Sequence, residues 1–95
     1  MAKYVYPAIF QTEDVGGYSV MFPDLLGCCT EGETIEEAIE MARDALGLYL
    51  YSLEEDKEPI PAPSKPDQIQ TKPGQFVTLI DVDMLGYCRK HDKRT

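Results

Sequence analysis

The sequence lacks tryptophan, contains a single histidine and has only three cysteines among its 95 residues. The cysteines are Cys28, Cys29 and Cys88, and an odd number with two members adjacent does not form a disulfide framework. Neighbouring side chains in an extended segment point to opposite faces, so we expect reduced, partly buried thiols and no bridge. The predicted location is therefore a reducing compartment, the cytoplasm.

Long apolar runs are also missing. No stretch approaches the roughly 20 apolar residues that a membrane-spanning helix needs, and residues 1–3 lead directly into strand-like sequence without a secretory leader pattern. We therefore expect no membrane partner. The length predicts one domain, and at this size a homodimer or higher homo-oligomer would bury useful additional surface.

The residues for catalysis are scarce as well. The histidine is His91, which lies in a polar terminal stretch without a neighbouring cysteine or apolar frame, and is typical of a solvated side chain. No pair of cysteines has metal-ligand spacing, and no glycine-rich loop has the pattern of a phosphate cradle. These observations predict a protein that is not an enzyme and needs no metal or cofactor.

Carboxylates leave one enzymatic alternative open. Asp14, Asp24, Asp81 and Asp83 lie near the ends of predicted strands, where acids can hold metal ions for phosphodiester cleavage. Asp14 and Asp24 also lie in predicted turns, where aspartate is common because it bonds to the local backbone. A metal-dependent nuclease or phosphoesterase is therefore the alternative to a binding protein.

Charge is unevenly distributed along the chain. The net charge is −8, with thirteen acidic and three basic residues in 1–58 and four basic and one acidic residue in 89–95. An acidic body disfavours nucleic acid and anionic membranes and favours a basic partner, although negative charge also aids solubility.

Three strands are predicted in the first third of the chain. Residues 4–10 and 18–22 are rich in aromatic and β-branched side chains, and the turn between them contains Gly16 and Gly17, which indicates a hairpin. Residues 28–31 form a brief third strand. Pro7 is unexpected inside a strand, because proline lacks the N–H that a sheet needs.

A helix follows with a clear N-terminal signal. Thr34 is a good N-cap, and Glu37 three residues later completes a capping box. Apolar residues then recur at spacings of three and four up to about Leu53, and the glutamates of the first turn suit the helix dipole. The helix is predicted to cover one face of a sheet.

The last third contains a connector and one more strand. Residues 58–73 carry five prolines, which predicts an extended connector, and residues 75–83 form a strand that is apolar on both faces over most of its length. We expect this strand to be interior to the sheet or paired across a dimer, and parallel to its neighbour after a right-handed crossover. The predicted fold class is α+β, in the order β-β-β-α-β.

A single helix leaves one face of this sheet uncovered. Aromatic side chains recur at strand spacing along both hairpin strands, which indicates either packing in the core and across strands or an aromatic surface on the face opposite the helix. Apolar residues on the face opposite the helix need a partner or a second copy of the chain.

The segment 17–28, GYSVMFPDLLGC, is followed by Thr30, Gly32, Thr34 and the pair Glu37-Ala38. This pattern resembles the HicB family of antitoxins, in which a strand-turn-strand of the form GYxxx[FV]PD[LF]xGC precedes a TxGxTxxEA helix start. The resemblance extends over residues 4–82, and Leu26 stands where the family often has proline.

The resemblance implies a partial ribonuclease H-like fold without the nuclease carboxylates, and the role of antitoxin in a type II toxin–antitoxin pair. The implied partner is a HicA-like toxin, a small basic mRNA interferase with a catalytic histidine. Family members also carry a C-terminal DNA-binding module that represses their own operon. An orphan oligomeric regulatory domain without a toxin is the remaining alternative.

On this basis we expect residues 1–83 to form the toxin-binding domain and residues 84–95 to be a basic tail or a linker to such a module. The tail is too short to be the module, so operator DNA would be a partner only if a module lies beyond this chain. Toxin contacts are expected from the hairpin and the following loop, at Asp14, Tyr18, Phe22, Asp24, Leu25 and Glu31.

Overall fold

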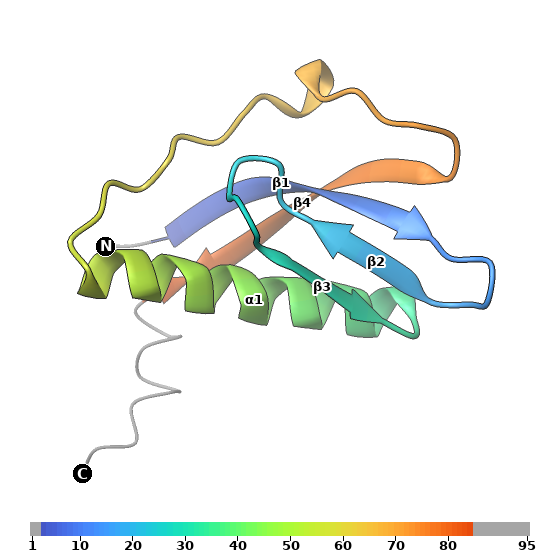
Figure 1. The fold of residues 1–95 in the computed structure, drawn as a ribbon, viewed down its shortest axis with the longest axis horizontal. Helices are drawn as coiled ribbons and strands as arrows, with labels where there is room; N and C mark the ends of the chain where they lie inside the picture. The colour runs from blue at the N-terminus through green and yellow to red at the C-terminus, as the bar shows by residue number, and fades with distance from the viewer. Residues whose placement is uncertain (1–2, 85–95) are drawn as a thin grey trace, which may run out of the picture.

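A computed structural model describes residues 3–84 of the chain, which form a four-stranded antiparallel sheet with one long helix along one face (Figure 1). The elements are β1 (Lys3–Thr12), β2 (Tyr18–Met21), β3 (Cys29–Gly32), α1 (Ile35–Glu55), the 3-10 turn η1 (Pro66–Gln68) and β4 (Gln75–Asp83). The α+β class, the β-β-β-α-β order and the single covering helix are confirmed. Within the described residues, no helix is long and apolar enough to cross a membrane.

The position and direction of β4 differ from the prediction. The strand order is β3-β2-β1-β4, so β4 is an edge strand and not an interior one, and it runs antiparallel to β1 with Lys3 opposite Asp83 and Gln11 opposite Gln75. A parallel crossover assumes that the chain enters the next strand close to the end of the helix. Here the connector (residues 56–74) first travels back along the length of the sheet, and β4 then runs in the same direction as α1 (Figure 1).

The surroundings of Pro7 explain how β1 accepts a proline. The Thr12 N–H donates to the Gly74 carbonyl at 3.0 Å, and the Glu13 N–H donates to the Gly17 carbonyl at 3.1 Å. By alternation, even positions of β1 bond to β4 and odd positions face β2. The N–H that Pro7 lacks would therefore face β2, which pairs with β1 only from Ile9 onward. No ladder bond is lost.

The start of α1 is capped nearly as predicted. The Glu37 N–H donates to the Thr34 side-chain oxygen at 3.0 Å, and the Glu37 carboxylate accepts from the Glu33 N–H at 2.7 Å. The bond to the Glu37 carboxylate thus comes from the residue before the predicted N-cap, Thr34. It still satisfies a backbone donor at the helix start. The helix ends at Glu55, two residues beyond the predicted end.

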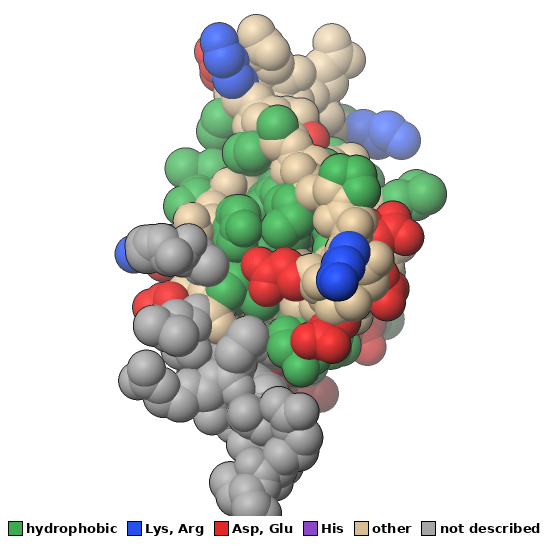
Figure 2. Space-filling model, turned by 90° about the vertical axis from the view of Figure 1, so that its left-hand side faces the viewer, with side chains coloured by type: hydrophobic (Ala, Val, Ile, Leu, Met, Phe, Trp, Pro, Cys, Tyr) green, Lys and Arg blue, Asp and Glu red, His purple; other side chains and the backbone are tan. Residues whose placement is uncertain are grey.

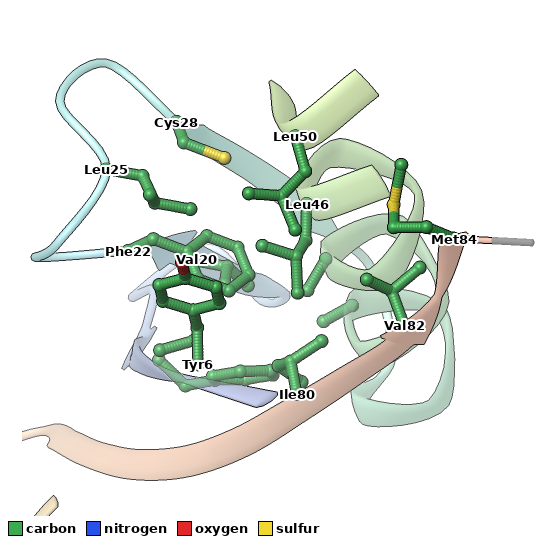
Figure 3. Packing of buried hydrophobic residues seen from close by; sticks show 14 residues of the cluster. Tyr6, Val20, Phe22, Leu25, Cys28, Leu46, Leu50, Ile80, Val82 and Met84 are labelled. Atoms are coloured by element: carbon green, nitrogen blue, oxygen red, sulfur yellow. The ribbon is translucent and has the colours of Figure 1, made fainter. Parts of the chain in front are cut away.

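The core lies between α1 and the inner face of the sheet. Leu46 and Leu50 of the helix face Val20 and Ile80 of the strands (Figure 3). The loop between β2 and β3 closes one side of this core with three buried side chains, Phe22, Leu25 and Cys28. The Tyr6 hydroxyl donates to the Pro61 carbonyl, which holds the connector against the same core.

Gly32 is the point of closest approach between β3 and α1. A Cβ atom at this position would lie 2.5 Å from the Ala38 nitrogen and 2.6 Å from its Cα. These are backbone atoms of a regular helix, so they cannot rotate away as a flexible side chain would. Any residue larger than glycine must therefore push the helix and the strand apart.

We expect Gly32→Ala to destabilise the fold by about 1–3 kcal/mol, because the added methyl group overpacks a rigid contact. For a domain of this size each kcal/mol lowers the melting temperature by roughly 4–8 °C, which calorimetry measures. Glu31→Ala is the control, since Glu31 is the exposed neighbour in the same strand. Equal stability of the two variants would contradict the close approach.

Candidate protein-binding site

The six predicted contact residues separate into two groups. Asp14 and Glu31 are exposed and Tyr18 is half-buried, and all three lie at the end of the sheet that carries the β1–β2 turn. Phe22 and Leu25 are only 2% and 1% exposed, so their side chains belong to the core. Asp24 lies in the same loop and bonds to the connector. The residue pattern alone could not distinguish these groups, because buried and exposed turn residues look alike in sequence.

A hollow of about 620 Å³ lies at the turn end of β3. Its acidic lining comes from three elements: Glu13 of the β1–β2 turn, Glu31 and Glu33 of the β3 end, and Glu37 of α1. Tyr18 and Met41 also line the hollow and supply an apolar surface. Glu33 and Glu37 were predicted only to suit the helix start, and their place beside Glu31 depends on the packing of α1 against β3.

A second hollow of about 570 Å³ lies at the other end of β3, on the same flank of α1. Cys29, Ala45 and Leu48 line it, together with the acidic side chains of Asp56 and Glu58. Figure 2, which views the molecule toward the C-terminal end of α1, shows acidic side chains gathered around that end beside a field of hydrophobic ones. Both hollows therefore combine an apolar lining with negative charge.

Asp24 holds the connector in place. Its carboxylate accepts hydrogen bonds from the Ser64 N–H at 2.9 Å and from the Ser64 hydroxyl. The residue therefore links the β2–β3 loop to a segment 40 positions later in the chain. This link, rather than a bond within its own turn, is what the structure assigns to the Asp24 side chain.

The face of the sheet opposite α1 is apolar in part. Leu79 is 54% exposed on this face, Val5 and Met21 are also exposed, and a shallow hollow of about 500 Å³ lies over Ile9. The prediction that a single helix leaves apolar residues uncovered is confirmed.

The carboxylates of the nuclease alternative lie on three separate segments. Asp14 lies in the β1–β2 turn, Asp24 lies by the connector, and Asp81 and Asp83 lie on β4. Asp81 bonds there to the Arg43 guanidinium at 3.1 Å. That hydrogen bond is the main cause that lowers the pKa of Asp81. Among residues 3–84 no three histidine, cysteine or acidic side chains are grouped to hold a metal ion. His91 and Cys88 lie outside the described residues.

The two adjacent cysteines have different surroundings, as predicted. Cys28 is buried and its thiol donates to the Ala45 carbonyl at 3.7 Å, whereas Cys29 is exposed. Burial is the main cause that raises the pKa of Cys28 to about 11. Cys28 therefore acts as a small core residue.

We expect alkylation to distinguish the two thiols. With a pKa of about 11, roughly one Cys28 thiol in a thousand is ionised at pH 8, and the thiolate is the reactive form. Iodoacetamide should therefore modify Cys29 at least about tenfold faster in a Cys88→Ser background, followed by mass spectrometry. In urea the rates should converge. Equal rates in the folded protein would show that Cys28 is accessible.

We expect Asp24→Ala to loosen the connector, because two hydrogen bonds to Ser64 are lost. The stability should fall by about 1 kcal/mol, and proteolysis between residues 58 and 72 should accelerate. Asp14→Ala is the matched control, because Asp14 is an exposed aspartate in the turn at the other end of β2. Unchanged proteolysis in Asp24→Ala would mean that Tyr6 and the core suffice to hold the connector.

Comparison with known proteins identifies similar chains. Residues 6–94 match a family described as HicB_like antitoxin of bacterial toxin-antitoxin system. Antitoxin HicB 1 of Photorhabdus laumondii is 41% identical over 66 residues, which cover 67% of this chain and 43% of that protein. The chain thus spans less than half the length of this relative.

Solved structures agree in fold. A chain from a toxin–antitoxin complex of Streptococcus pneumoniae superposes with a TM-score of 0.83 at 25% identity, covering 99% of this chain and 78% of that one. The N-terminal domain of the Burkholderia pseudomallei antitoxin HicB superposes with a TM-score of 0.69 at 30% identity, covering 84% of this chain and 99% of the domain.

Proposed function

Because the chain belongs to the HicB-like antitoxins of bacterial toxin–antitoxin systems, we propose that it binds and neutralises a small basic toxin of the HicA type. The observation that carries this proposal is the acidic hollow between the β1–β2 turn, β3 and α1. Four acidic residues from three elements line it, beside the apolar surface of Tyr18 and Met41. The protein acts by binding in the cytoplasm and catalyses no reaction.

Neutralisation follows from competition for positive charge. A toxin that cleaves RNA must present cations to the phosphate backbone. Carboxylates held in a fixed arrangement occupy those cations, and complementary potentials also accelerate the encounter. Among the described residues, no lysine or arginine lines the hollow, so its negative charge is not offset there.

The proposed contact residues have different roles. Asp14, Tyr18 and Glu31 lie at the surface and contact the toxin directly. Phe22 and Leu25 act from the core by fixing the β2–β3 loop, and Asp24 fixes the connector beside it.

A second copy of the chain is the proposed occupant of the sheet face opposite α1, because Val5, Met21 and Leu79 are exposed there. Burial of this face would give the homodimer predicted from the small size of the domain. Regulation through operator DNA is proposed only for a protein that carries a DNA-binding module in addition to residues 1–95.

The test is co-expression with a short basic protein of the HicA type, to be sought in the reading frame next to this chain. We expect the chain to restore growth and to co-purify with that protein. The double variant Asp14→Lys with Glu31→Lys should weaken binding at least about tenfold. Asp67→Lys, compared with Asp14→Lys alone, is the charge control, since each reverses one acidic residue and Asp67 lies on η1. Full rescue by the double variant would contradict the electrostatic role.

We further expect association with this partner to depend on salt. The rate constant should fall at least about tenfold between roughly 50 and 500 mM NaCl, because screening shortens the range of the carboxylate field. Stopped-flow fluorescence measures the rate, and the dissociation rate should change much less. A flat dependence would mean that the acidic surface serves solubility alone.

A further inference from the structure

The outer edge of β3 has unpaired backbone groups. The Phe22 N–H donates to the Cys28 carbonyl at 3.0 Å, and the register of β2 and β3 continues from this pair. By alternation, Thr30 and Gly32 bond to β2, while Cys29 and Glu31 direct their N–H and C=O groups away from the sheet. Within residues 3–84, no hydrogen bond is recorded to these outward groups. They form a template for one more strand.

The opposite edge of the sheet is partly blocked. The Arg43 side chain donates from Nε to the Asp81 carbonyl at 2.9 Å, which occupies one outward group of β4. The η1 turn also packs against β4. Lys3 and Arg43 add positive charge there, which opposes a basic partner. Of the two edges, β3 is the open one.

The flank of α1 beside β3 is apolar. Met41, Ala45 and Leu48 follow one another at spacings of four and three, so they lie along one side of the helix. Met41 is 42% exposed and Leu48 is 57% exposed. Since Leu48 lines one hollow with Cys29 and Met41 lines the other with Glu31, a strand added next to β3 would lie over this flank and cover both side chains.

Acidic residues at both ends of β3 favour a basic strand at its outer edge. Glu31, Glu33 and Glu37 lie at one end of β3, and Asp56 and Glu58 lie at the other. No lysine or arginine of the described chain lines either hollow. A second copy paired along β3 would bring its own acidic residues against these, so it would be repelled at this edge. A basic strand would be attracted at both ends.

We propose that a basic segment of the partner toxin adds a strand to the outer edge of β3 and packs on Met41 and Leu48 of α1. This inference rests on the proposed function and specifies how the partner docks. The backbone of Cys29 and Glu31 supplies the hydrogen bonds, and the carboxylates at both ends receive the lysine or arginine side chains of the segment. The sheet then has five strands, and the partner's cations are removed from contact with RNA.

Hydrogen exchange tests the pairing directly. The full chain is compared alone and in complex with the basic protein of the HicA type. We expect the amides of Cys29 and Glu31 to exchange at least tenfold more slowly in the complex. Thr30 and Gly32 are internal controls, because their amides already bond to β2. Val77 and Leu79 report on the outward edge of β4, and protection there instead would overturn the proposal.

A proline substitution removes a single outward donor. Glu31→Pro loses the N–H that faces the partner and keeps the β2 ladder, since position 31 does not bond to β2. Glu31→Gln loses the same charge but keeps the N–H. We expect the proline variant to bind at least tenfold more weakly than the glutamine variant at equal melting temperature. Equal affinities would overturn the strand pairing.

A pair of leucines provides a further test, in which β3 itself is not substituted. Leu48→Gln removes an apolar contact beside β3, and Leu79→Gln removes an equally exposed leucine, at 54%, from the other face of the sheet. We expect the Leu48 variant to lose at least fivefold in affinity and the Leu79 variant less than twofold. The reverse order would place the partner on the face opposite α1.

The outcomes separate this inference from the proposed function. If the basic protein of the HicA type does not bind the chain at all, the proposed function fails. If the complex forms without protection of Cys29 and Glu31, only the docking mode fails. If the isolated chain shows this protection at raised concentration, a second copy occupies the edge and the docking mode is again overturned.

Discussion

The contact between Gly32 and Ala38 determines where every other surface of the molecule lies. At this point the backbone of β3 meets the backbone of α1 with no room for a Cβ atom. The Thr34 cap begins the helix two residues later, so the chain turns from strand to helix within a few ångströms of its own core. The start of the helix is thereby positioned beside β3, and its acidic first turn is brought beside Glu31.

Much of the fold follows from local sequence patterns. The hairpin, the helix cap and the proline connector each depend on residues close together in the chain, and all three are present in the structure. The direction of β4 could not be predicted in this way. It depends on the path of the connector, which is set by the bonds of Tyr6 to Pro61 and of Asp24 to Ser64, and these join residues 40 or more positions apart.

The candidate site was predictable only in part. Asp14, Tyr18 and Glu31 were predicted as contact residues from their place in the hairpin and the following loop; Asp14 and Glu31 are exposed and Tyr18 is half-buried. Phe22 and Leu25 were grouped with them because they are neighbours in sequence, yet both point into the core (Figure 3). The contribution of Glu33, Glu37 and Met41 arises from tertiary packing and has no signal in spacing alone.

The placement of β4 brings together segments of the chain that are far apart in the sequence. Residue 3 pairs with residue 83 and residue 11 with residue 75, so this pairing closes the longest loop in the described chain, and such contacts are the slowest to form during folding. The strand lies at an edge and is reached through a connector held by a few side-chain bonds, whereas β1, β2, β3 and α1 follow one another through short links. A cut in the connector would leave β4 attached only through its nine residue pairs with β1 and through its side chains in the core, so the sheet would then consist of two separate chain segments.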